Sequence, residues 1–190
     1  MSADAEIISL ITTALRTLGF KDFGVKLNNR KILTGIGIYA GVPDEQLGSL
    51  YRVVDKLDKI GLDGVAKELS ENGIADDVVS RMMALLEKRD DDGLTALSNL
   101  SAQLGDIAPA QEGIDELRQM IEYMEAMQVP AQNVDVDFAM ARGLSYYTGP
   151  IFETIITDPN LGSVTGGGRY DDLIGLFRKE SLPTVGTSLG

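Results

Sequence analysis

The amino-acid sequence predicts an α+β protein in which an all-helical region is inserted into an antiparallel sheet with its own helices. Apolar residues recur at helical spacing through the middle of the chain, whereas both ends contain short alternating runs punctuated by glycine and proline. The charge follows the same division, because 19 of the 29 acidic residues lie between positions 43 and 128. We therefore expect residues 1–42 and 129–190 to form one sheet-based domain, and residues 43–128 to form a helical insertion.

The first block contains a helix, a strand and a second helix. Apolar spacing between residues 7 and 18 indicates an amphipathic helix, with Ser2 as a candidate N-cap and Gly19 at its end. The alternation that follows, within residues 23–29, is typical of a strand, and a second helical stretch runs from 30 to 39.

The other two blocks differ in their predicted secondary structure. The middle block repeats helices between glycine or acidic turns without a fixed period, and its charge predicts a solvated helical surface or, as the alternative, an acidic interaction surface. The last block predicts antiparallel strands joined by tight turns. The expected helices are 43–60, 62–69, 75–86, 94–104 and 114–127, and the expected strands are 134–138, 151–157 and short runs around Val164 and Val185.

The composition excludes several kinds of chemistry. The chain of 190 residues contains no Cys and no His, which excludes disulfides, thiolate metal sites and histidine-based triads. A net charge of −12 argues against a chain that grips nucleic acid over its whole surface. There is no apolar run of transmembrane length and no basic leader, so we expect no membrane contact and a cytoplasmic location.

Residues 142–150 form the first motif with chemical content, Arg-Gly-Leu-Ser-Tyr-Tyr-Thr-Gly-Pro. A guanidinium at the end of a strand suits phosphate or carboxylate, because it donates two parallel hydrogen bonds. If Tyr146 and Tyr147 lie on a strand, they point to opposite faces, and only one of them lines a given surface. The alternative is a simple hairpin with an exposed Arg142.

The second motif is the glycine trio at 166–168, followed by Arg-Tyr-Asp. Ordering glycine costs roughly 1 kcal/mol per residue relative to alanine, so three together indicate that something lies against the backbone. The pattern is neither a P-loop nor a dinucleotide fingerprint, since it lacks Gly-Lys-Ser/Thr and its glycines are contiguous. A flexible hairpin turn is the alternative.

Together, the two motifs resemble the two histidine-specific signatures of histidyl-tRNA synthetases. Residues 185–190 resemble the start of class II motif 3, residues 4–6 and 25–33 resemble the stretch that follows motif 2, and the helical middle falls where that family carries its insertion. Ser145 stands where many members have Asp. The resemblance implies a partial class II synthetase antiparallel sheet with an inserted helical domain.

The resemblance also implies a reaction and a site. The family activates histidine with ATP to histidyl-adenylate and transfers the histidyl group to tRNA(His). Arg142 is then the catalytic residue at the α-phosphate of ATP. The residues implied for histidine binding are Leu144, Tyr146, Tyr147, Gly166, Gly167, Gly168 and Tyr170, and those implied for ATP binding are Arg142, Gly186 and Gly190.

Further expectations follow from the same resemblance. ATP enters as its Mg complex, no protein-bound metal is expected, and the parent enzyme is a homodimer. Lys56, Lys59 and Lys67 are the candidate basic spot for the tRNA acceptor arm. Because motifs 1 and 2, the rest of motif 3 and the anticodon-binding domain are missing, we expect an excised segment without aminoacylation activity of its own.

Two other functions compete with the ligase. A histidine-binding regulatory paralogue, such as the regulatory subunit of ATP phosphoribosyltransferase, shares the fold but has no need of a cation at an α-phosphate, and its middle region is usually shorter. A purely structural module of acidic helices is the third hypothesis. Both Arg142 and the long insertion favour the ligase.

Overall fold

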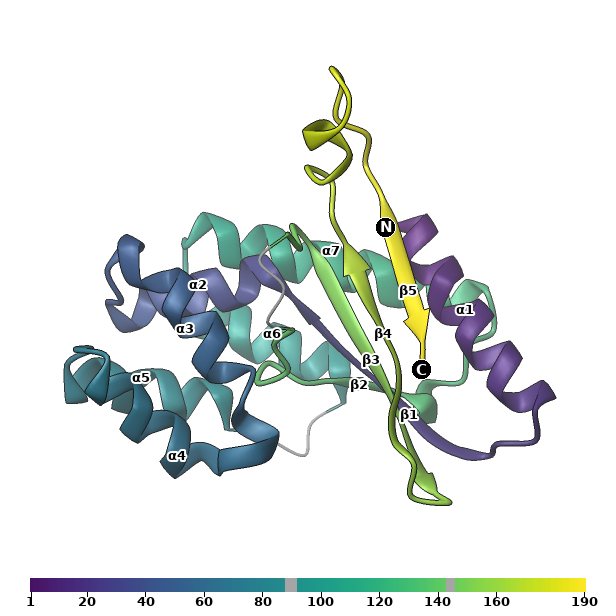
Figure 1. Ribbon diagram of the computed structural model, residues 1–190, viewed down its shortest axis with the longest axis horizontal. Helices are drawn as coiled ribbons and strands as arrows, with labels where there is room; N and C mark the ends of the chain where they lie inside the picture. The colour runs from purple at the N-terminus through teal and green to yellow at the C-terminus, as the bar shows by residue number, and fades with distance from the viewer. Residues whose placement is uncertain (88–91, 143–145) are drawn as a thin grey trace.

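A five-stranded sheet with helices packed on one face and beyond one end makes up the fold (Figure 1). The computed structural model describes residues 1–87, 92–142 and 146–190. The helices are α1 (Ser2–Thr17), α2 (Arg30–Ala40), α3 (Leu47–Val54), α4 (Leu57–Glu71), α5 (Asp76–Leu86), α6 (Gly93–Leu104) and α7 (Ala108–Ala126). The strands are β1 (Asp22–Asn29), β2 (Val134–Val136), β3 (Pro150–Asp158), β4 (Gly162–Arg169) and β5 (Val185–Leu189).

The strand order is β2-β1-β3-β4-β5, and one pairing differs from the expected antiparallel sheet. Strands β1, β3, β4 and β5 pair antiparallel, whereas β2 runs parallel to β1, with Val25 opposite Val134. The physical reason is the connection. Between β1 and β2 the chain runs through the helical region instead of a tight turn, and such a crossover returns it in the same direction.

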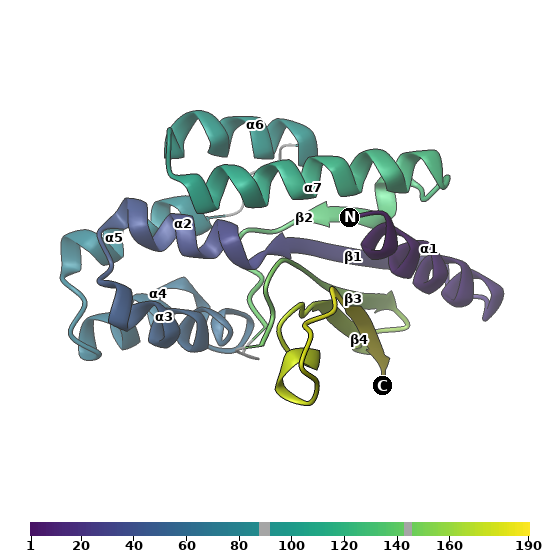
Figure 2. The same cartoon turned by 90° about the horizontal axis from the view of Figure 1, so that it is seen from above.

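The two faces of the sheet have different environments. Phe23, Val25 and Leu27 alternate along β1 and are buried, and α1 and α7 pack along the face that holds the core (Figure 2). The opposite face carries polar groups in register, because Lys26 lies opposite Glu153, which in turn lies opposite Gly166 on β4. We call this second surface the open face.

The helical predictions are confirmed in outline and corrected in detail. The expected helix at 43–60 is a 3₁₀ turn, Asp44–Gln46, followed by α3, and α4 begins before Gly61, whose φ of 69° interrupts it. Ser2 is not the N-cap of α1, because that helix already includes it. Asn29 does cap α2, since its side chain accepts a hydrogen bond from the Lys31 amide.

The boundaries at 42/43 and 128/129 stay predictions, but α7 connects the regions on either side of them. It packs against α2, α1 and β1, so it belongs to the layer that covers the sheet. The buried apolar residues form one continuous cluster that runs from the sheet into the helices.

Candidate functional site

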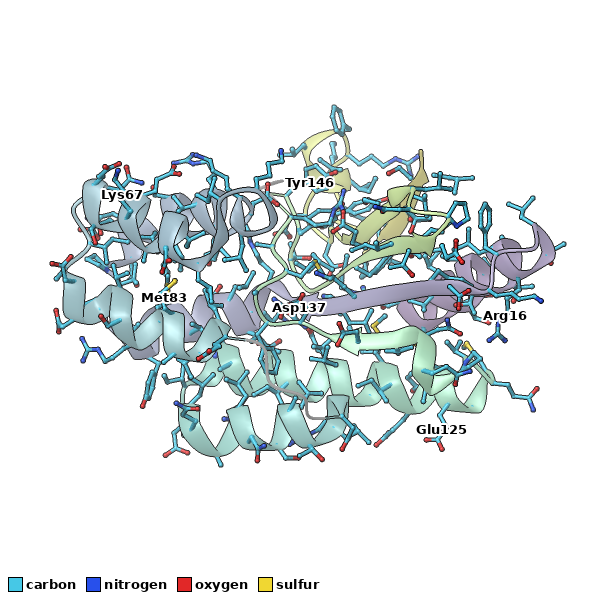
Figure 3. All side chains as sticks on the ribbon, turned by 90° about the horizontal axis from the view of Figure 1, so that it is seen from below. Arg16, Lys67, Met83, Glu125, Asp137 and Tyr146 are labelled. Carbon is cyan, nitrogen blue, oxygen red and sulfur yellow. The ribbon has the colours of Figure 1, made fainter. Side chains whose placement is uncertain are left out.

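Side chains of strand β1 bind the segment that precedes Arg142. The Asn28 amide, which is fully buried, donates hydrogen bonds to the carbonyls of Phe138 and Met140 at 2.9 and 2.8 Å. Lys26 forms an ion pair with Asp137 at 3.0 Å. Figure 3 labels Asp137, which directly follows β2, and Tyr146, which lies further along the same connection to β3. Residues of β1 therefore hold in place the main chain that precedes Arg142.

The guanidinium of Arg142 lies flat against the backbone of Gly166. A Cβ atom at Gly166 would overlap the guanidinium carbon and both of its terminal nitrogens. Nη1 of Arg142 donates to Oε1 of Glu153 at 3.2 Å, while its Nε is buried and lacks a hydrogen-bond partner among the described residues. A buried N–H donor without a partner is costly, so the packing on Gly166 and the contact with Glu153 must hold the guanidinium in this position.

Three tyrosines stand beside the guanidinium. The ring centroids of Tyr146 and Tyr147 are 4.7 Å apart, and the ring of Tyr170 lies 5.8 and 6.5 Å from theirs. Consecutive tyrosines were expected to diverge only on a strand, and these two do not lie on one. They lie in an irregular segment before β3, where the alternation of a strand does not apply, and both line the same cavity.

Tyr147 is held in its neutral form. Burial raises the pKa of Tyr147 to about 12, and a hydrogen bond with Tyr146 acts in the same direction, whereas the charge and hydrogen bond of Arg142 oppose the rise. Tyr147 therefore keeps its proton at neutral pH and offers both a donor and an acceptor.

The glycine trio lies inside β4, not in a turn. On the open face, Gly166 supports Arg142, and a Cβ at Gly168 would lie 2.9 Å from the Tyr147 ring. A Cβ at Gly167 would overlap the backbone carbonyl of Gly186 and lie 2.7 Å from the ring of Phe152. Two of the glycines thus make room for site residues, and the third makes room for the core.

One cavity of about 290 Å³ joins these groups. Its walls are Arg142, Tyr146, Tyr147, Gly166, Tyr170, Leu173, Gly186, Thr187 and Ser188. Of the other predicted site residues, Gly167 and Gly168 are not among the walls of this cavity, and Leu144 is outside the described residues. Gly190 follows β5 and donates to the carbonyl of Val164 instead of lining the cavity.

Sequence reasoning missed several wall residues. Ser188 shares a face with Gly186, so strand alternation from a predicted residue identifies it. Leu173 comes from the irregular stretch after β4, for which the sequence contained no signal. Glu153 was also missed, although it lies opposite Gly166 on the neighbouring strand.

A second cavity, of about 580 Å³, lies between the helical region and the same arginine. Arg142 lines both cavities. The remaining walls of the second cavity are Val54, Asp55, Leu57, Lys59, Asp137, Ala139, Met140, Ala141 and Glu153.

Ion pairs of Arg169 connect the two motifs to helix α1. Asp4 on α1 is fully buried and binds Arg169 at two points, one of them a 3.1 Å bond from Nε. Arg169 also pairs with Asp171 at 3.0 Å, and its carbonyl accepts from the Thr148 amide. Burial lowers the pKa of Arg169, but the hydrogen bond and charge of Asp4 outweigh it, so the pKa is raised. Arg169 therefore joins both motifs to α1.

The predicted basic spot is largely neutralised. Lys56 pairs with Glu68 at 2.5 Å and Lys67 with Glu71 at 3.8 Å, while Lys59 lines the second cavity. Figure 3 shows Lys67 at the far end of the helical region from Tyr146. The three lysines thus do not form one free cationic patch.

Two features of other classes of protein are absent from the described residues. These residues contain no group of three or more histidine, cysteine, aspartate or glutamate side chains placed to hold a metal ion. None of their helices has the length and apolarity needed to cross a membrane.

The fold is that of a class II aminoacyl-tRNA synthetase. The crystal structure of histidyl-tRNA synthetase from Nostoc sp. PCC 7120 matches with a TM-score of 0.92 and 33% identity, covering 100% of this chain and 44% of that one. A family model described as histidyl-tRNA synthetase matches residues 1–190. The chain belongs to the histidyl-tRNA synthetase family.

The relatives are longer proteins. The histidine–tRNA ligase of Aeropyrum pernix is 38% identical over 193 residues, which cover 99% of this chain and 42% of the relative. The chain thus spans less than half the length of the curated relatives that it matches. A structure from Bacillus halodurans, described as an ATP phosphoribosyltransferase regulatory subunit/histidyl-tRNA synthetase, shares the fold with a TM-score of 0.80 at 22% identity. The regulatory alternative is therefore more distant and is not favoured.

Proposed function

We propose that this chain supplies the histidine- and α-phosphate-binding part of a histidine–tRNA ligase. The observation that carries the proposal is the cavity in which Arg142, lying on Gly166, meets the three tyrosines. A cation beside neutral hydroxyl groups suits a substrate that has an anionic end and a polar ring.

The proposed step is the activation of histidine. An oxygen of the histidine carboxylate forms a bond to the α-phosphorus of ATP, and the bond from that phosphorus to the bridging oxygen of pyrophosphate breaks. Negative charge develops on the α-phosphoryl oxygens, and the fixed cation of Arg142 stabilises it. Arg142 lines the cavity, so its cation lies beside the space that the phosphate would occupy. Mg enters with ATP as part of the substrate.

The other wall residues bind the two substrates. Tyr147 and Tyr170 hydrogen-bond the imidazole or amino group of histidine, and Gly186 forms the floor of the adenine side. The hydroxyl of Tyr170 lies against the backbone of Gly186, so these two groups share one wall. Roles for Leu144 and Gly190 remain predictions from the family resemblance.

The wider assignments belong to the whole protein. We propose that the product adenylate transfers its histidyl group to tRNA(His), that the complete enzyme is a homodimer and that it works in the cytoplasm. The acceptor arm then needs a contact other than the three paired or separated lysines.

The decisive test is a chimera. Residues 1–190 replace the matching segment of the Aeropyrum pernix ligase, and histidine-dependent ATP–pyrophosphate exchange is measured. We expect exchange by the chimera, a loss of about a hundredfold or more in Arg142→Ala, and no exchange by the isolated chain. A folded chimera that binds histidine but supports no exchange contradicts the proposal and favours the regulatory alternative.

A further inference from the structure

Glu153 is the one charged side chain described in contact with the guanidinium of Arg142. Its Oε1 accepts from Arg142 Nη1 at 3.2 Å and from the hydroxyl of Ser163 at 2.6 Å, so that a single carboxylate oxygen joins the arginine to β4. Glu153 is 19% exposed and Arg142 is 24% exposed, so water screens the pair only in part.

The contact with Glu153 engages one nitrogen of the guanidinium. Nη1 donates to Glu153, Tyr147 forms a further hydrogen bond with the guanidinium, and Nε is buried without a partner among the described residues. An arginine that donates through one nitrogen to a fixed carboxylate has lost much of its rotational freedom before a ligand arrives. Its remaining donors are then oriented in advance.

The main chain and the side chain of Arg142 are fixed independently. Asn28 holds the preceding backbone through the carbonyls of Phe138 and Met140, and this contact does not involve Glu153. Removing the Glu153 carboxylate should therefore free the guanidinium while the backbone stays in place.

We propose that Glu153 is a positioning residue for Arg142. It holds the guanidinium flat on Gly166, so that the cation is set in place beside the tyrosine-lined cavity before a substrate arrives. The role at the substrate rests on the proposed function, whereas the positioning itself is a property of the isolated chain. The geometry requires an acceptor oxygen at position 153 more than it requires a negative charge.

The first experiment follows the Nε–H NMR signal of Arg142 in the isolated chain, assigned by its loss in Arg142→Lys. In Glu153→Ala we expect this proton to exchange with water about tenfold faster, because the released guanidinium reaches solvent. Glu153→Gln keeps an acceptor oxygen and should restore slow exchange. Glu125→Ala, at an exposed site on α7 (Figure 3), should change nothing.

Two outcomes overturn the proposal: a folded Glu153→Ala with unchanged exchange, or a Glu153→Gln that exchanges as fast as Glu153→Ala. If Glu153→Ala does not fold, Ser163→Ala decides. It removes the second tether from the same oxygen and should accelerate exchange, and unchanged exchange contradicts the positioning role.

The second experiment uses the chimera. Glu153→Ala should lower kcat for ATP–pyrophosphate exchange by about tenfold or more with little change in KM for histidine, because a misplaced cation acts mainly on the transition state. Glu153→Gln should recover most of kcat, and an unchanged kcat in Glu153→Ala contradicts the role in catalysis. If the unsubstituted chimera shows no exchange, the proposed function fails, while the NMR result still decides the positioning.

Discussion

At the residue scale, the hydrogen atom that Gly166 carries in place of a side chain lets a guanidinium rest on the sheet. The overlap that a Cβ would create involves only the far end of a flexible side chain, and Arg142 can swing away. The fold can therefore accept alanine at this position, but the site cannot. A substitution at Gly166 should therefore reduce activity more than it reduces the stability of the fold.

We predict that Gly166→Ala displaces Arg142 while lowering the free energy of unfolding by no more than about 1–2 kcal/mol. The displacement should speed Nε–H exchange of Arg142 and lower exchange activity in the chimera by about tenfold or more. Gly24→Ala is the matched control, because a Cβ at Gly24 in β1 meets nothing within 4 Å. Equal behaviour of the two variants contradicts the prediction.

Tyr147 gives a prediction about pH. Its pKa is raised to about 12 from 10.0, so the folded state favours the neutral phenol. The stabilisation is complete below about pH 10, the unfolded value, and is lost as the pH rises through 10 to 12. Urea unfolding across this range should show a steeper loss of stability in the wild-type chain than in Tyr147→Phe, and parallel curves would count against the assignment.

At the scale of elements, the crossing of α2 and α7 determines how the helical layer joins the sheet. A Cβ at Gly35 would overlap the side chain of Ala110 and lie 2.9 Å from its Cα. On the facing helix, a Cβ at Gly113 would lie 3.0 Å from the backbone nitrogen of Ile32. Small residues on both helices therefore let the two backbones approach closely.

We predict that Gly35→Ala destabilises the chain by about 1–2 kcal/mol, because overpacking against backbone exceeds the gain of about 1 kcal/mol in helix propensity. Gly48→Ala in α3 is the control, since its Cβ meets nothing within 4 Å and should stabilise by up to about 1 kcal/mol. Urea denaturation of both variants checks the pair. A stabilising Gly35→Ala would show that the crossing is not tight.

At the scale of the whole molecule, the sheet and the helices share one core. The buried apolar cluster is continuous, and α7 packs against α1, α2 and β1. The helical region is therefore not attached to the sheet only by two linkers. Stability should be shared across both parts.

We predict a single cooperative unfolding transition in urea. The helical signal at 222 nm and the fluorescence of the six tyrosines should give the same midpoint, since loss of α7 exposes the core of the sheet. Two separate transitions, or midpoints that differ between the two signals, would show that residues 43–128 fold as a separate unit.

Much of the site was predictable because its chemistry lies in two short motifs. An arginine at a strand end and three consecutive glycines occur for few structural reasons, so both indicated a binding site. The structure brings Gly166 and Arg142 together. Glu153 and Ser188 were not predicted, because each reaches the site only through strand register. Leu173 reaches it through irregular chain, which has no period to follow.

By itself, the sequence determined which segments are helical and strand-like, the absence of histidine and cysteine chemistry, and the two motifs, because spacing and residue type are local properties. Only the tertiary structure decided that β2 runs parallel to β1, that both tyrosines face one cavity and that α7 covers the sheet. These outcomes depend on which segments meet across long stretches of chain, and backbone pairing and close packing settle them only when the whole core assembles.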